Sequence, residues 1–356
     1  MHMADALISP IVGGALWGAT IITASYSLKK AKIDINDNKI PMMGIMAAFV
    51  FASQMINFSI PGTGSSGHLG GGLILAAALG PYAGFIAMSS VLAIQALFFA
   101  DGGLLAYGCN AINLGFFSCF LAYPLIYKTI ARDGASRRRN YIAALAAAIV
   151  GLQLGSLAVV FETLLSGKTE LPFAAFLALM QPIHLAIGIV EGFVSAAVIA
   201  FIRSSAPALL DSSATNTATR RTEAKAFGIP RKTIIGLVLA TLVMGGLFSW
   251  FASSNPDGLE WAIQKAAGVE ELEVAGSFYD VASSIQSVTA FLPDYGFKAP
   301  QTASLNADSQ AEPSNTWPTV DEGTSLSGIV GGTMTLGLST LAGVIIMLMR
   351  RKSSKA

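Results

Sequence analysis

The feature that most constrains this chain is a series of long apolar stretches separated by short polar or charged segments. We predict nine membrane helices, because about 20 mostly apolar residues are needed to cross a bilayer. They cover residues 7–27, 42–60, 68–80, 82–100, 104–130, 141–165, 172–203, 233–252 and 325–349. Hydrophobic residues make up 53% of the chain and charged residues 12%, which is unlike a soluble domain. The sequence therefore predicts an all-α integral membrane protein.

Basic residues occur in clusters between these stretches, at residues 29–39, 128–139, 203–232 and 350–352. With nine spans, every cluster falls on the same side of the membrane, which the positive-inside rule assigns to the cytoplasm. The amino terminus is then predicted outside and the carboxyl terminus inside. A net charge of +1, held in separate clusters, also argues against a nucleic-acid partner.

Residues 204–230 are polar, rich in small residues and low in aromatics, the composition of a flexible linker. We predict a membrane unit over 1–203 with seven helices, a cytoplasmic linker over 204–232, and a two-helix unit over 233–350. The outer loop of the second unit contains eleven acidic and two basic residues between Asp257 and Glu322. This loop is either simply solvated or weakly attracts cations to the outer surface.

Histidine occurs three times, and one copy is His2. A bulky second residue favours retention of Met1, so the chain is expected to begin with a free amine. That amine, the deprotonated amide of His2 and its imidazole can hold one metal ion in a plane through consecutive chelate rings. Square-planar nitrogen coordination suits Ni(II) or Cu(II) better than zinc, calcium or magnesium. The alternative is an unordered terminal residue.

The fourth corner of such a square could be filled by His68, which stands in the run GTGSSGHLGGG. Glycines let the backbone bend and approach closely there, and the predicted topology puts His68 on the same outer face as His2. A polar residue at a helix cap is the alternative for His68. Considered together, the residues predict a metal site of Met1, His2 and His68. The run lacks the GK[ST] ending of a phosphate loop, so energy from ATP would have to come from another subunit.

Four further polar residues within predicted spans could support this site. Asn110 and Asn113 could orient a ligand loop or bond helix to helix. His184 and Glu191 lie seven apart, on one helix face. They could orient metal ligands or form a buried ion pair, and the ion pair is favoured. Cys109 and Cys119 lack metal or redox spacing and are interpreted as apolar filler.

Several stretches resemble the CbiM/NikM family, the substrate-binding (S) membrane component of energy-coupling-factor cobalt and nickel transporters. They are MHMADALISPIVG at the amino terminus, the run from GTGSSGHLGGG to NAINLGF, and HLAIGIVEGFV. This resemblance covers residues 1–203. SSNPDGLEWA resembles the PDGLE domain of the small NikN-type accessory component, over residues 233–349. The chain therefore resembles a fusion of the two components.

The resemblance implies a seven-helix S-component bundle in a prokaryotic cell membrane, with the amino terminus outside. It implies that the metal is held by the Met1 amine, the amide and imidazole of His2, and His68. The chain is then a transporter subunit and not an enzyme; it needs no cofactor, and the metal is its cargo.

Family membership also implies partners beside membrane lipid: a transmembrane T component of the CbiQ/NikQ type and cytoplasmic ATPase subunits of the CbiO/NikO type. In the first span, Gly14 with Gly18 and Ala15 with Ala19 are pairs of small residues that permit close helix approach. They could dock the T component or a neighbouring helix of this chain.

The predicted function is Ni(II) uptake, favoured by the planar nitrogen set and by the PDGLE-type unit. Cobalamin-linked Co(II) uptake by the same mechanism is the alternative. Copper would bind such nitrogens more tightly than either, so affinity alone does not name the physiological metal. A secondary transporter predicts inverted repeats, and an intramembrane metalloprotease predicts HExxH. The sequence shows no convincing example of either.

Overall fold

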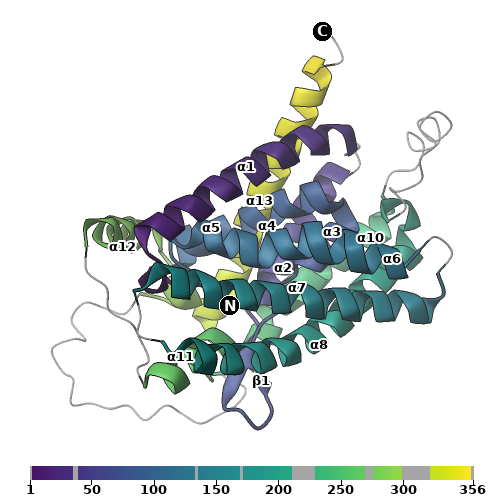
Figure 1. The fold of residues 1–356 in the computed structure, drawn as a ribbon. Helices are drawn as coiled ribbons and strands as arrows, with labels where there is room; N and C mark the ends of the chain where they lie inside the picture. Colours follow the sequence, from purple (N-terminus) through teal and green to yellow (C-terminus); the bar gives the residue numbers. More distant parts are fainter. Residues whose placement is uncertain are drawn as a thin grey trace.

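The structure is a computed structural model that describes residues 2–34, 39–132, 135–168, 171–210, 229–268, 276–298 and 321–353. Long helices packed side by side make up most of it (Figure 1). Six are long and apolar enough to cross a membrane: Pro10–Lys32, Pro81–Phe99, Tyr107–Ile130, Arg137–Ser166, Phe173–Ser205 and Glu322–Lys352. These helices confirm the predicted all-α membrane class. Helices suit a membrane because each one satisfies its own backbone hydrogen bonds, which lipid cannot do. The predicted count of seven plus two helices is not confirmed, since six such helices lie among the described residues.

The first part of the chain contains eight α-helices and one hairpin among its described residues. The α-helices are α1 (Pro10–Asp34), α2 (Lys39–Gln54), α3 (Gly72–Leu79), α4 (Pro81–Ile94), α5 (Tyr107–Asn110), α6 (Lys128–Ile130), α7 (Arg137–Ser166) and α8 (Phe173–Ser205). The strands β1 (Phe58–Ile60) and β2 (Ser65–Gly67) pair antiparallel. Short 3-10 helices are η1 (Asp5–Leu7) and η4 (Pro207–Leu209), and π-helical segments are η2 (Gln95–Phe99) and η3 (Ala111–Tyr127). Segment η3 joins α5 to α6, so residues 107–130 form one span.

Three predicted spans differ from the structure. Residues 233–252 form a 16-residue helix (Arg231–Gly246) and then a 3-10 helix (Phe248–Phe251), and they are not among the six helices long and apolar enough to cross a membrane. Residues 68–80 do not form a span, because α3 has eight residues and reaches about 12 Å at 1.5 Å per residue, well short of a bilayer core of about 30 Å. Residues 42–60 form α2 only as far as Gln54, after which β1 begins. The departures at 42–60 and 68–80 leave irregular backbone around the glycine run. Such backbone is tolerated at membrane depth where protein and not lipid surrounds it, and the residues of α3 are buried.

The second part of the chain comprises α10 (Arg231–Gly246), η5 (Phe248–Phe251), α11 (Gly258–Ala267), α12 (Ser277–Thr289), η6 (Pro293–Tyr295) and α13 (Glu322–Ser353). Helix α13 packs along α2 and α10. A Cβ atom on Gly44 of α2 would collide with Thr340 and Leu336 of α13. The backbones of α10 and α13 approach each other equally closely at Gly245 and Gly328. Gly44 thus lets the second unit pack closely on the first, and Gly245 with Gly328 allows close packing within the second unit, as is common between membrane helices.

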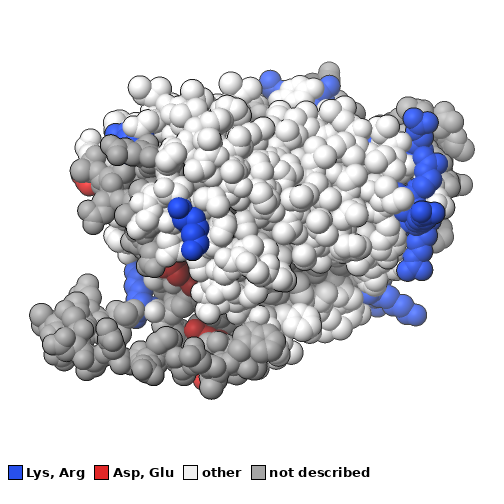
Figure 2. Space-filling view, turned by 60° about the horizontal axis from the view of Figure 1, so that its bottom comes forward, with Lys and Arg blue, Asp and Glu red and all other residues white. Residues whose placement is uncertain are grey.

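Helices α11 and α12 lie toward one end of the molecule in Figure 1, and α6 lies at the other. Figure 2 shows Lys and Arg side chains gathered over the α6 end. The exposed basic residues of α6 and the start of α7 are Lys128, Arg132, Arg137, Arg138 and Arg139. The surface of the α6 end is therefore basic.

Candidate metal centre

The amino-terminal tail is inserted into the protein. The backbone N–H of Met3 donates to Oδ1 of Asn110 (2.7 Å), and Nδ2 of Asn110 donates to the Met3 carbonyl (3.2 Å). The N–H of Gly103 also donates to that carbonyl (2.9 Å). Further along, Asp5 accepts the N–H of Ala106 (2.9 Å). The predicted candidate Asn110 thus anchors the tail beside His2.

His2 and His68 meet at the end of this tail. Their ring centroids lie 4.9 Å apart and their planes are within 9° of parallel. Both side chains are largely buried, with His2 6% exposed and His68 8% exposed. Met1, whose amine is a predicted ligand, lies outside the described residues. Two imidazoles from residues 66 positions apart are therefore held together in a protected place.

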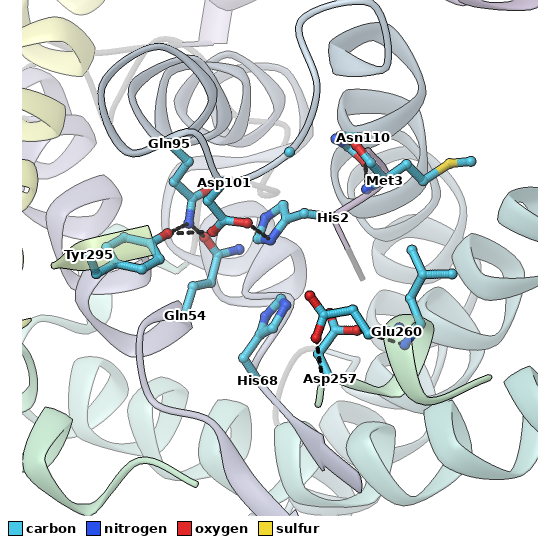
Figure 3. A network of polar contacts seen from close by, with 12 residues as sticks. His2, Met3, Gln54, His68, Gln95, Asp101, Asn110, Asp257, Glu260 and Tyr295 are labelled. Carbon is cyan, nitrogen blue, oxygen red and sulfur yellow. Dashed lines mark hydrogen bonds and ion pairs between the residues drawn. The ribbon is translucent and has the colours of Figure 1, made fainter. Parts of the chain in front are cut away.

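Asp101 pairs with His2, its carboxylate Oδ1 lying 3.0 Å from Nδ1 of His2 (Figure 3). It also accepts a short hydrogen bond from the hydroxyl of Tyr295. Burial alone would raise the pKa of Asp101, but the His2 imidazole and these hydrogen bonds outweigh it and hold the pKa well below its usual range. Burial and the adjacent carboxylate raise the pKa of Tyr295 well above its usual range, so the hydroxyl keeps its proton and donates.

His68 is fixed by its own loop. Its Nδ1 lies 3.1 Å from the Leu69 carbonyl, so Nδ1 carries the proton and Nε2 carries the lone pair. Burial lowers the pKa of His68 to about 3. The ring is therefore neutral at physiological pH, which is the form that binds metal.

The glycines after His68 are held by Glu191 of α8. Its two carboxylate oxygens accept the N–H groups of Gly70 (2.7 Å) and Gly71 (3.0 Å). The favoured sequence interpretation, an ion pair between Glu191 and His184, is wrong. His184 bonds instead to the Met180 carbonyl through Nδ1 (2.8 Å). A shared helix face does not show what lies opposite that face.

His184 nevertheless lies near the candidate centre. A small cavity is lined by Gly67, His68, Gly70, Leu114, Leu152, His184, Ile187 and Gly258. Among the described residues, Nε2 of His184 is a buried atom with no hydrogen-bond partner. The cavity thus brings His184 to the back of the loop that contains His68.

Asn113, the remaining candidate, contacts the tail less directly. Its Nδ2 donates to Glu162 of α7 (2.8 Å) and lies 3.6 Å from the Met3 sulfur. Sequence reasoning did not consider Glu162, although an acidic residue within a span is itself a signal of function. Cys109 and Cys119 are free and buried.

The second unit covers the hairpin that leads to His68. Ser66 pairs in parallel with Asp257, and its N–H donates to the Pro256 carbonyl (2.8 Å). The indole N–H of Trp261 donates to the Thr63 carbonyl (3.0 Å). Figure 3 shows Asp257 and Glu260 beside His68.

The PDGLE motif explains this contact. Asp257 caps α11 by accepting the N–H groups of Leu259 (2.8 Å) and Glu260 (2.9 Å). The Glu260 carboxylate accepts the Asp257 N–H (3.0 Å), which completes a capping box. A Cβ atom on Gly258 would collide with Ile183 of α8. The glycine therefore lets α11 dock onto α8, with the acidic cap at the histidines.

The centre offers two imidazoles, of His2 and His68, with the carboxylates of Asp101 and Asp257 beside them. Among the described residues, no group of three or more His, Cys, Asp or Glu side chains is arranged to hold a metal ion. A metal ion bound between His2 and His68 would therefore draw on backbone or terminal nitrogens as well.

Residues 2–209 match the CbiM family, described as the cobalt uptake substrate-specific transmembrane region. The chain belongs to the CbiM family. Residues 231–348 match the PDGLE domain. The CbiM match thus covers the tail, both histidines and Glu191, and the PDGLE match covers Asp257 and Tyr295.

Two relatives and one solved structure extend the CbiM comparison. A provisionally named fused nickel transport protein NikMN of Archaeoglobus fulgidus is 29% identical over 95% of this chain and 96% of its own length. A fused nickel transport protein NikMN of Rhodobacter capsulatus is 33% identical over 59% of this chain and 64% of its own. A crystal structure of a truncated transition metal transporter is 28% identical, with a TM-score of 0.51, and the match covers 57% of this chain and 99% of that one.

Proposed function

We propose that this chain is the metal-capturing membrane component of an ATP-driven energy-coupling-factor transporter that takes up Ni(II). The observation that carries the proposal is the meeting of His2 and His68, buried and with ring centroids 4.9 Å apart. The CbiM match over residues 2–209 and the names of the fused nickel transport relatives support it. In this proposal the ligands are the Met1 amine, the amide and imidazole of His2, and His68.

In this proposal the His2 imidazole turns when the metal binds. In the chelate, Nδ1 of His2 is the ring nitrogen that closes a six-membered ring with the backbone amide. In the structure Nδ1 faces Asp101. A half-turn of the ring about the Cβ–Cγ bond would direct Nδ1 away from Asp101 toward the metal and would place Nε2–H where Cε1 now lies, on the edge of the ring next to Asp101. A carboxylate that accepts the second N–H of a ligating histidine is the usual support for such a ligand.

The topology in this proposal follows the basic surface of the α6 end. The basic α6 end of Figure 2 faces the cytoplasm by the positive-inside rule, and the histidine end, covered by α11, faces outward. Metal would be captured outside and passed inward when partner subunits hydrolyse ATP.

A surface for a partner helix is present on α1. Among the described residues, and apart from its neighbours and the nearby backbone of its own helix, a Cβ atom built on Gly14 or on Gly18 would have no atom within 4 Å. Ala15 of the same helix is exposed. We propose that this small-residue face docks the transmembrane T component, since close helix approach in lipid relies on small residues.

The choice of Ni(II) over Co(II) rests on coordination chemistry. Four nitrogens in a plane suit the d8 ion Ni(II). Co(II) uptake is the second candidate, favoured by the cobalt description of the CbiM match.

The experiment that tests the proposal measures Ni(II) and Co(II) binding by the purified chain in detergent. The intact protein is compared with His2→Ala, with His68→Ala and with a form extended by one residue before Met1. We expect all three changes to abolish tight Ni(II) binding, and the intact complex to be yellow and diamagnetic. If the extended form binds as well as the intact chain, the terminal amine is not a ligand and the proposed chelate is refuted.

A further inference from the structure

One side chain of the second unit reaches the carboxylate that holds His2. Tyr295 donates its hydroxyl hydrogen bond to Asp101, 194 residues earlier in the chain. Asp101 contacts Nδ1 of His2 at 3.0 Å. The three residues therefore form a line from η6 of the second unit to the predicted metal ligand (Figure 3).

The Tyr295 hydroxyl is also tied to the loop that contains His68. Nε2 of Gln95 donates to that hydroxyl (3.2 Å) and to Oε1 of Gln54 (3.0 Å). Nε2 of Gln54 in turn donates to the carbonyl of Gly70 (2.8 Å). Gly70 lies two residues after His68. One hydroxyl thus belongs to a hydrogen-bonded chain that ends at His2 on one side and, on the other, at Gly70 in the loop that follows His68.

The ring of Tyr295 is held from two sides. It stacks on Phe99 with centroids 5.1 Å apart and planes 23° from parallel. It meets Phe51 edge to face at 6.1 Å. Pairs of this geometry stabilise beyond the area that they bury. Removing only the hydroxyl therefore leaves the packing of the ring in place.

The backbone on both sides of the contact is strained. Three non-glycine residues have left-handed φ angles in the described part of the chain: Ala100 (55°), Asp294 (49°) and Tyr295 (61°). Ala100 directly precedes Asp101, and Asp294 directly precedes Tyr295. Such conformations are costly for residues that have a side chain, and they cluster at functional sites. All three strained residues therefore lie at, or directly before, Asp101 and Tyr295, which are the two partners of one hydrogen bond.

We propose that Tyr295 is a positioning residue of the metal centre, which orients the His2 imidazole through Asp101. This inference rests on the proposed function, because His2 must be a metal ligand for its orientation to matter. The second unit then belongs to the binding site itself. Asp101 keeps a carboxylate oxygen directed at His2 because Tyr295 and the strained turns fix the carboxyl group. Outer partners of metal ligands typically change affinity 10- to 100-fold when removed.

The test compares Ni(II) binding by the full chain and by Tyr295→Phe in detergent, with the absorption spectrum of bound Ni(II) as a second readout. Tyr279→Phe is the matched control, because its hydroxyl donates to the Ile8 carbonyl (2.8 Å) and not to Asp101. A double-mutant cycle adds Asp101→Ala with and without Tyr295→Phe. Helix content and gel filtration verify that each variant is folded.

We expect Tyr295→Phe to raise the Ni(II) Kd about 10- to 100-fold and to shift the Ni(II) absorption bands. Tyr279→Phe should keep the Ni(II) Kd within about twofold of the wild-type value. Adding Tyr295→Phe to Asp101→Ala should change the Kd by less than about twofold relative to Asp101→Ala alone, because the coupling partner is then absent. An unchanged Kd and spectrum in Tyr295→Phe, or equal effects with and without Asp101, overturn the positioning role alone. A wild-type chain that binds no Ni(II) overturns the proposed function and this inference with it.

Discussion

Replacing Glu191 by glutamine should loosen the loop that presents His68. The two carboxylate oxygens accept one N–H each, from Gly70 at 2.7 Å and from Gly71 at 3.0 Å. Hydrogen bonds to charged groups contribute about 1.5–3 kcal/mol each. A glutamine has one acceptor oxygen, so one N–H of the loop would face an amide that is itself a donor. We therefore expect Glu191→Gln to lower the free energy of unfolding by about 2–4 kcal/mol.

The same substitution should weaken metal binding, because His68 precedes this loop. About 1.4 kcal/mol corresponds to a tenfold change in affinity. If half of the hydrogen-bond energy lost on replacing Glu191 is also lost from metal binding, the Ni(II) Kd rises clearly. The assays are thermal unfolding and Ni(II) titration of the purified chain. Glu162→Gln is the matched control, since a glutamine carbonyl at 162 can still accept the bond from Asn113. If Glu191→Gln unfolds and binds Ni(II) like Glu162→Gln, the anchoring role is refuted.

Two further predictions concern His68 and the PDGLE motif. His68 has a folded-state pKa of about 3 against 6.5, so the unfolded chain binds the additional proton and stability falls as the pH drops through this window. The loss in the free energy of unfolding is about 2 kcal/mol at about pH 5. Thermal unfolding of His68→Asn should therefore depend less on pH than that of the wild type. Equal pH dependence of the two proteins would contradict a neutral, buried His68. Gly258→Ala should cost about 1–3 kcal/mol through the collision with Ile183, whereas Gly246→Ala, with open space around its Cβ, should cost less in the same assay. Equal losses in the two variants would contradict tight docking of α11 on α8.

The membrane class could be predicted from the sequence because lipid imposes long apolar runs. The same criterion failed for α3, whose eight residues are apolar because protein surrounds them. Hydropathy reports the polarity of a segment's surroundings and does not separate lipid from a protein interior. The strand β1 was missed because its three residues lie at the end of an apolar run, and β2 was missed because its sequence, SSG, has no apolar alternation.

The candidate centre was only partly predictable. His2 and His68 could be selected because histidine is rare in the chain and because a terminal chelate is determined by local covalent geometry. Asp101 and Tyr295 could not, since their contact joins residues 194 apart and depends on two turns in unusual conformations. Glu191 was selected by its helical spacing from His184, but spacing gives the face of a helix and not its partner.

The hydrogen bonds that dock the second unit onto the hairpin have a consequence for assembly. Ser66, Thr63 and Asn57 all receive or supply bonds to residues 253–261. If the two units were separate proteins, each such encounter would be bimolecular and would depend on the amount of both. On one chain the encounter is intramolecular, at an effective concentration that can reach the millimolar range. The stoichiometry is then one to one in every molecule, and the contact can remain weak enough to open without the two units ever separating.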